Sequence, residues 1–120
     1  MTQEDKKLLL IDLCARLPYG IICECLHSNT IKATAIDTED LSVYYFDCDE
    51  WESIGHCKPY LRPMSSMTEE EEKEFQEIKL SYHFDEDSYI LFDWLNKKMF
   101  DYRGLIEKGL TLEAPKGMYV

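Results

Sequence analysis

The sequence has little glycine and none of the glycine-rich motifs that cradle phosphate groups. Its five glycines are scattered along 120 residues, and neither GxxxxGK[ST] nor GxGxxG occurs. The hydrolase motif GxSxG and the zinc-protease motif HExxH are missing as well. The sequence therefore contains no motif that indicates one of the common nucleotide-binding or hydrolase folds. Residues distant in sequence can still meet in a folded active site.

Basic side chains are also scarce, and long apolar runs are missing. Thirteen lysines and arginines against 24 acidic residues give a formal charge of -11, which opposes non-specific attraction to nucleic acid and to anionic lipid. No apolar run approaches the roughly 20 residues that a membrane-spanning helix needs. The N-terminus places acids before its leucines, unlike a secretion signal. We expect a cytoplasmic protein that contacts neither nucleic acid directly nor a membrane.

Five cysteines are an odd number, and reduced thiols in the cytoplasm are the simplest account of them. Cys23, Cys25 and His27 alternate along a predicted strand and so point to one side, with His56 and Cys57 as further possible zinc ligands downstream. The paired CxxC motifs of a zinc ribbon are missing, however, and cysteine is among the most often buried residue types. Buried core thiols are the favoured interpretation, and we expect no metal and no other cofactor.

The first twenty residues predict a helix followed by a turn. Thr2 with Asp5 three residues later forms a capping box, and a helix is expected over Gln3–Arg16. Pro18 cannot continue that helix. Its buried stripe is expected to contain Leu10, Leu13, Cys14 and Leu17.

Three β-prone runs follow, separated by turn residues at 27–29 and 38–40. The runs are Gly20–Leu26, Thr30–Ile36 and Leu41–Asp47, and we expect an antiparallel meander. A weaker fourth strand is expected over His56–Leu61.

The segment Lys58–Thr68, KPYLRPMSSMT, separates this β-rich half from a helical half. It contains Pro59 and Pro63 and is expected to be an ordered connection. Thr68 and Glu71 form a second capping box. The helix that follows should bury Phe75, Ile78 and Tyr82 and expose its glutamates, Glu69 to Glu72.

A third helix is expected to start at Asp87 or Ser88 and to run through YILFDWLNKKMF. It is apolar on most sides, so we expect it to be the central helix. A short helix over DYRGLIEKGL, ended by Gly109, and an extended tail that pairs with a sheet edge should complete the chain. The sequence thus predicts one α+β domain over residues 1–120: an N-terminal helix, a three- to four-stranded antiparallel sheet and C-terminal helices.

Aromatic and basic side chains of the second half are the candidates for a partner surface. Tyrosine, tryptophan and arginine are frequent interface hot spots, but they also fill the cores of small domains. Trp94 and Phe100 belong to this group. The surface to test first consists of Tyr60, Arg62, Tyr102 and Arg103.

Two alternatives stay open. Carboxylates along the surface, in Asp37–Glu52, Glu69–Glu72 and Asp85–Asp87, could imitate a phosphate backbone and inhibit a DNA- or RNA-binding protein, although acidic runs usually serve solubility. A small enzyme that uses His56 or His83 with nearby carboxylates is the other alternative, because histidine titrates near neutral pH.

The segments MTQEDKKLLLIDLCARLPYG, KPYLRPMSSMTEEEE and FDWLNKKMFDYRGLIEKGLTLEAPKGMY resemble a family of small uncharacterised proteins from gut Bacteroides and their relatives, often in phage-like or mobile-element surroundings. The resemblance implies a bacterial or phage cytoplasmic origin and assigns no catalytic or binding residue. From the residues themselves, the expected function is that of a non-enzymatic accessory protein that binds another protein.

Overall fold

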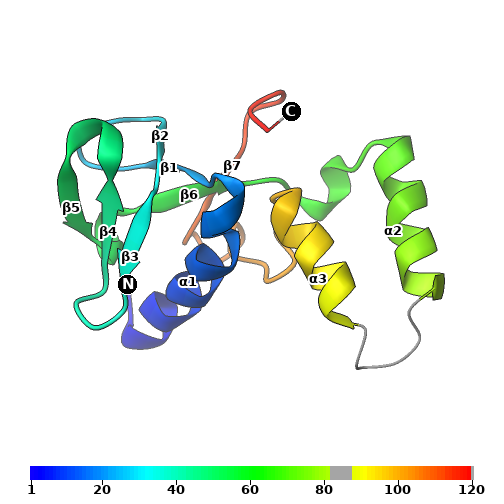
Figure 1. The fold of residues 1–120 in the computed structure, drawn as a ribbon, viewed down its shortest axis with the longest axis horizontal. Helices are drawn as coiled ribbons and strands as arrows, with labels where there is room; N and C mark the ends of the chain where they lie inside the picture. Colours follow the sequence, from blue (N-terminus) through cyan, green and yellow to red (C-terminus); the bar gives the residue numbers. More distant parts are fainter. Residues whose placement is uncertain (82–87, 120) are drawn as a thin grey trace.

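The computed structural model describes residues 1–81 and 88–119 and confirms an α+β fold. Helix α1 lies between the strands β3, β4 and β5 on one side and helices α2 and α3 on the other (Figure 1). The helices are α1 (Gln3–Arg16), α2 (Glu69–Ser81) and α3 (Ser88–Lys97). The strands are β1 (Ile22–Glu24), β2 (Ile31–Lys32), β3 (Ala35–Asp37), β4 (Ser42–Tyr45), β5 (Glu50–Ser53), β6 (Lys58–Leu61) and β7 (Leu112–Glu113).

Helix α1 begins and ends where the sequence predicts. The Thr2 hydroxyl accepts a hydrogen bond from the Asp5 amide, and the Asp5 carboxylate accepts one from the Thr2 amide, both at 3.0 Å. A short 3₁₀ turn that contains Pro18 follows, and Gly20 then adopts a φ of 83°, which favours glycine. The predicted buried stripe is only partly right, because Cys14 is exposed. The buried residues of α1 are Leu9, Asp12, Leu13 and Arg16.

The predicted three-stranded meander is wrong in one respect, because the run Thr30–Ile36 is divided between two sheets. Strand β2 pairs with β1, and β3 pairs with β4. A single straight strand would place Ala33 and Ile36 on opposite faces, since side chains alternate. The chain passes from one sheet to the other between the two strands, so that Ala33 is buried and Ile36 still packs against the core.

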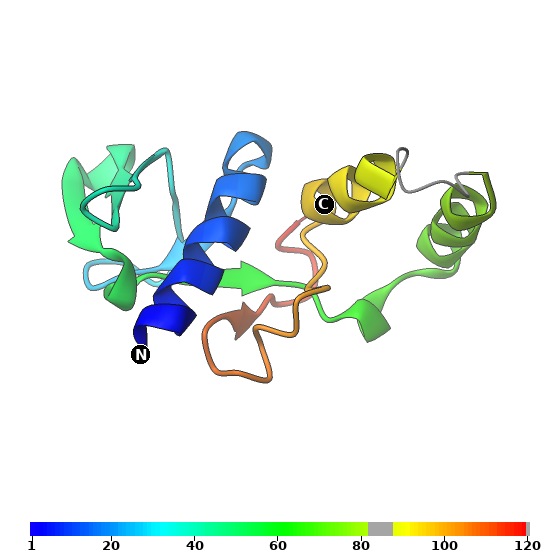
Figure 2. The same ribbon diagram turned by 90° about the horizontal axis from the view of Figure 1, so that it is seen from below.

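The four-stranded sheet has the order β2-β1-β6-β7, and the three-stranded sheet has the order β3-β4-β5. Strand β6 confirms the predicted fourth strand, and Figure 2 shows it running from the sheets toward the helical half. The tail pairs with it in parallel as β7. Strand β5 was not predicted, because its residues Glu50–Ser53 look like part of an acidic loop.

Helix α3 is not the central helix. Its first turns are largely open to solvent, with Tyr89 66% and Phe92 44% exposed, and only its last turn is buried. The surface of α3 is instead divided among contacts with α1, contacts with α2 and the open side of the molecule. Stacking of Phe75 on Trp94, with ring centroids 6.0 Å apart, joins the two helices. The expected contact of Tyr82 lies outside the described residues.

The short helix predicted over DYRGLIEKGL is also wrong, since this segment forms turns. The Asp101 carboxylate accepts hydrogen bonds from the amides of Leu105 and Ile106, both at 2.9 Å. These bonds hold the chain in a compact turn that ends at Gly109, whose φ is 74°. The side chain thus satisfies the amides that a helix would have paired.

The core lies between α1, both sheets and the segment 99–110. The fully buried apolar side chains of the core are Leu9, Leu13, Ile21, Cys23, Val43, Tyr45, Ile54, Cys57, Leu61, Phe100 and Leu105.

Within residues 1–81 and 88–119, no helix is long and apolar enough to cross a membrane.

Candidate functional site

The four residues predicted to form a partner surface do not form one patch. Tyr60 lies on β6, where its hydroxyl donates a hydrogen bond to the Asn29 carbonyl at 2.9 Å and so holds the β1–β2 loop. Its carbonyl accepts a hydrogen bond from Tyr119 at 2.8 Å. Tyr60 therefore supports the β-sheet end of the molecule.

Arg62 connects the end of β6 to α2, and its guanidinium is engaged in these internal contacts. Its guanidinium donates two hydrogen bonds to the Glu71 carboxylate, at 2.7 and 2.8 Å, and lies 4.2 Å from the ring centroid of Phe100. The bidentate bond to Arg62 lowers the pKa of Glu71 to about 2. Glu71 also completes the predicted capping box with Thr68, at 3.0 and 3.1 Å. The expectation that the four glutamates 69–72 are all solvated is thus wrong for Glu71, which is 8% exposed.

Arg103 is positioned by the buried carboxylate of Asp12. That carboxylate receives a hydrogen bond from Arg103 through one oxygen and from Arg16 through the other, the latter at 2.9 Å. Arg16 also donates to the Phe100 carbonyl at 2.7 Å. Both guanidiniums lie over the ring of Tyr102, at 5.4 Å for Arg16 and 4.6 Å for Arg103. Cation–π contact thus orients the Tyr102 ring beside α3.

An open hollow of about 580 Å³ lies where Tyr102 and Arg103 meet α3. Tyr102 donates a hydrogen bond to the Asn96 side-chain oxygen at 2.9 Å, and its ring lies 5.2 Å from that of Phe92. We call this site the α3 hollow. Its lining residues are Ser88, Tyr89, Phe92, Asp93, Asn96, Tyr102 and Arg103.

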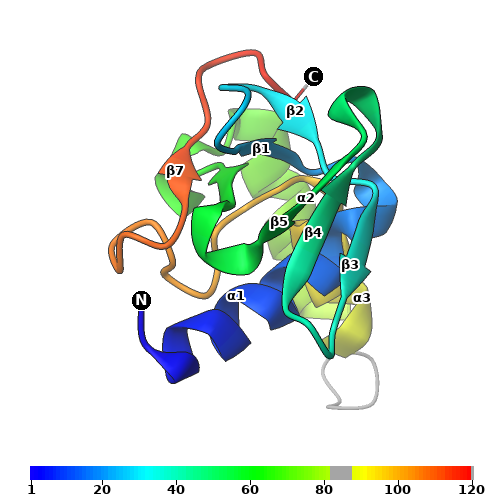
Figure 3. The ribbon, with the colours of Figure 1, turned by 90° about the vertical axis from the view of Figure 1, so that its left-hand side faces the viewer.

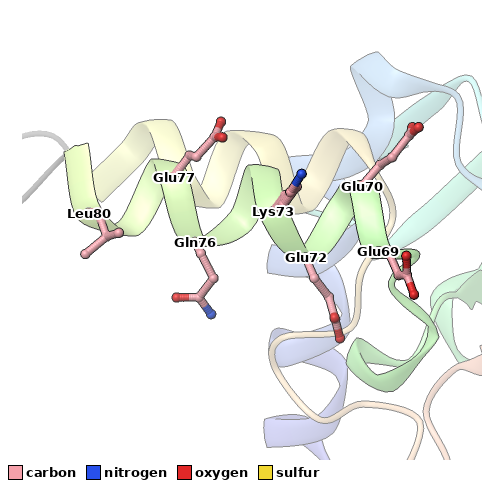
Figure 4. A pocket seen from close by; sticks show the side chains of 7 residues that line it. All are labelled: Glu69, Glu70, Glu72, Lys73, Gln76, Glu77 and Leu80. Atoms are coloured by element: carbon pink, nitrogen blue, oxygen red, sulfur yellow. The ribbon is translucent and has the colours of Figure 1, made fainter.

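A second surface depression lies along the outer side of α2. Figure 4 shows that all of its side chains come from this one helix and fan outward from it. The depression is therefore an acidic helix face whose side chains point away from one another rather than toward a common binding point. Its side chains are Glu69, Glu70, Glu72, Lys73, Gln76, Glu77 and Leu80.

The predicted metal ligands are not gathered at one point. Cys23, Cys25 and Cys57 are buried free thiols, whereas His27 and His56 are exposed. In the described part of the chain, no group of three or more histidine, cysteine, aspartate or glutamate side chains is arranged to hold a metal ion.

Cys23 and Cys57 interact with each other in the core. A hydrogen bond to Cys57 and burial raise the pKa of the Cys23 thiol, while the same contact lowers the pKa of Cys57. The Tyr45 hydroxyl lies beside Cys57 without a well-formed hydrogen bond, and burial raises its pKa. These thiols are packed where solvent and ligands have no access, as the core interpretation predicts.

No histidine or cysteine lines either depression. His56 is exposed at the end of a 3₁₀ turn, and His83 lies outside the described residues. Neither depression therefore offers a histidine against a carboxylate, which is the arrangement that an acid–base enzyme would need.

Comparisons with protein-family models, curated proteins and solved structures find no match.

Sequence reasoning identified Tyr102 and Arg103 but missed the residues that position them. Asp12 and Arg16 were not singled out from the sequence, although their spacing of four residues is that of a helical ion pair. Phe92 belongs to the helix that was expected to be central. Only the packing of α3 shows that it faces the hollow.

Proposed function

We propose that this chain is a non-enzymatic accessory protein that binds another protein through the α3 hollow. One observation carries the proposal: Tyr89 and Phe92 expose 66% and 44% of their surface at the rim of a hollow that also contains Tyr102 and Arg103. Exposed aromatic side chains next to arginine are typical of interface hot spots. Two aromatics on one helical turn are available for burial against a partner.

The polar groups of the hollow are held in place before binding. Arg103 is fixed by Asp12 and by the ring of Tyr102, and the Tyr102 hydroxyl is fixed by Asn96. Side chains that are already ordered lose little conformational entropy when a partner binds. This preorganisation supports a binding role.

The hollow favours a partner segment that carries an apolar side chain beside a carboxylate. The apolar group would pack on Phe92 and Tyr89. Among residues 1–81 and 88–119, one Arg103 nitrogen is bonded to Asp12, and the further guanidinium N–H groups remain as donors for a carboxylate. Asp93 on the same helix already accepts a hydrogen bond from Tyr19 at 2.5 Å.

Affinity capture with matched variants tests the proposal. Wild-type protein and the Tyr89→Ala/Phe92→Ala variant are used to capture proteins from the bacterial host group that the resemblance suggests. Leu80→Ala is the control, because Leu80 is 67% exposed on α2. A protein retained by the wild type and the control but lost from the double variant is then purified.

Calorimetry with that purified protein decides the outcome. We expect the double variant to bind at least about 10-fold more weakly than the wild type, as for loss of a hot-spot residue. Equal affinity of both forms for every captured protein would refute a role of the α3 hollow. A circular dichroism spectrum unchanged from the wild type ensures that the variant is folded.

A further inference from the structure

The three-stranded sheet β3-β4-β5 and its loops carry most of the net charge of the protein. Seven of the 24 acidic residues and none of the 13 lysines and arginines lie between Ala33 and Cys57, so this fifth of the chain contributes -7 to the formal charge of -11. Six of these acids are exposed, and the seventh, Glu52, is buried. The exposed acids are Asp37, Glu39, Asp40, Asp47, Asp49 and Glu50.

Aromatic rings lie among these charges. Tyr44 on β4 and Trp51 on β5 are direct cross-strand partners, with ring centroids 5.1 Å apart. Trp51 is 52% exposed, and Phe46, just after β4, is 70% exposed. The Tyr44 hydroxyl donates a hydrogen bond to Asp49 at 2.6 Å, which joins the aromatic pair to an acidic side chain.

No helix or strand of the described residues covers the sheet face that bears these rings. Val43 and Tyr45 alternate with Tyr44 along β4 and are fully buried on the opposite side. Figure 3 shows the three strands nearest the viewer, with α1 behind them. Strand β5 is also the last strand of its sheet, so one side of its backbone faces no other described strand.

We propose that this face, with Tyr44, Phe46, Trp51 and the exposed acids around them, binds a lysine- and arginine-rich segment of a partner protein. Charge complementarity selects the partner: the face offers carboxylates without a competing basic side chain of its own segment. The rings add a second attraction, because a guanidinium or ammonium group stacks favourably on the faces of tryptophan and tyrosine. This surface is separate from the α3 hollow.

Solubility alone explains the acids but not the rings. The outer face of α2 is the internal comparison, since it is also acidic but carries Lys73 and no aromatic side chain (Figure 4). An exposed tryptophan–tyrosine pair among acids adds apolar surface, which works against solubility. Acidic side chains next to exposed aromatic rings fit a partner whose basic side chains can also stack on those rings.

The test measures binding of a short fluorescent peptide rich in lysine and arginine by fluorescence anisotropy. A peptide in which glutamine replaces the basic residues is the reference. The variants are Trp51→Ala, Asp47→Asn/Asp49→Asn beside the aromatic pair, and Glu72→Gln/Glu77→Gln on α2. The two double variants each remove two negative charges. Comparing them therefore distinguishes an effect of the local site from an effect of the net charge of the protein.

We expect Trp51→Ala to weaken peptide binding about 10-fold and Asp47→Asn/Asp49→Asn to weaken it about 3-fold or more. Glu72→Gln/Glu77→Gln should change it less than about 2-fold. Binding should also fall as salt is raised, because the Debye length shortens to about 8 Å at physiological ionic strength. The glutamine peptide should not bind.

Equal losses in the two charge variants, or wild-type affinity of Trp51→Ala, would overturn the proposal. Trp51→Phe keeps a ring and should retain most of the affinity, which guards against a folding defect in the alanine variant. Chemical-shift changes in the wild-type protein give a further readout that needs no variant. They should map to residues 37–51, and changes confined to α2 would refute the site.

Discussion

Asp12 and Arg16 lie one turn apart on α1 and form an ion pair in which both side chains are fully buried. Asp12 also binds Arg103, and Arg16 binds the Phe100 carbonyl, so this pair ties α1 to the chain about 90 residues later. The Arg16 Nη1 atom has no hydrogen-bond partner among the described residues. The network thus holds two guanidiniums with one carboxylate.

Replacing Asp12 with alanine should destabilise the protein by about 3–5 kcal/mol, because it leaves a buried guanidinium without its counter-charge. Urea unfolding followed by circular dichroism measures the loss. Glu4→Gln is the control, since Glu4 is exposed on the same helix and should change the free energy of unfolding by less than about 0.5 kcal/mol. A loss below about 1 kcal/mol in Asp12→Ala would contradict this account.

Glu71 makes stability depend on pH in the acidic range. Its pKa is about 2 in the folded protein, whereas the ordinary pKa of a free glutamate side chain is 4.5. A lowered folded-state pKa means that the carboxylate stabilises the protein above about pH 4.5 and that this contribution, about 2–3 kcal/mol, disappears as the pH falls toward 2.

Glu71→Gln should therefore be less stable than the wild type at pH 7 and similar to it near pH 2. Urea titrations over this pH range measure the difference. Glu70→Gln, an exposed neighbour in the same helical turn, should follow the wild-type curve. A constant gap between wild type and Glu71→Gln at all pH values would show that the Arg62 contact does not depend on the charge of Glu71.

Tyr119 anchors the C-terminal tail to the four-stranded sheet. Its hydroxyl accepts a hydrogen bond from the Ile22 amide at 2.9 Å and donates one to the Tyr60 carbonyl at 2.8 Å. Tyr119→Phe leaves both groups without this partner and should cost about 1–3 kcal/mol of stability. Tyr89→Phe, at an exposed position, should be neutral in the same thermal unfolding assay. Equal stability of the two variants would count against the anchor.

The five thiols should fall into distinct reactivity classes. Cys14 is exposed, Cys48 is partly buried, and the other three are buried. A disulfide reagent such as Ellman's should modify Cys14 first and should reach Cys23, Cys25 and Cys57 only after denaturation. Cys14→Ser should remove the fast phase of thiol release. Fast release of three or more thiols from the folded protein would contradict the packing of Cys23 against Cys57.

Elements with a local chemical signal could be predicted from the sequence. Both capping boxes, at Thr2–Asp5 and Thr68–Glu71, start helices as expected, and β6 and the paired tail were also predicted. Local hydrogen bonds and proline constraints act within a few residues, so they can be recognised without knowledge of the fold. Of the site, Tyr102 and Arg103 were named by residue type alone.

The rest depends on contacts between residues far apart in the chain. The amphipathic period of α1 does not reveal that Asp12 and Arg16 face inward, because their burial requires Arg103 and the Phe100 carbonyl to meet them. The apolar surface of α3 likewise could not show which side would be left open. By itself the sequence determined where α1 and α2 begin and which residue types are candidates for binding. Tertiary packing decided which polar groups are paired in the core and which aromatic rings stay exposed, since burial depends on the neighbours that the whole fold supplies.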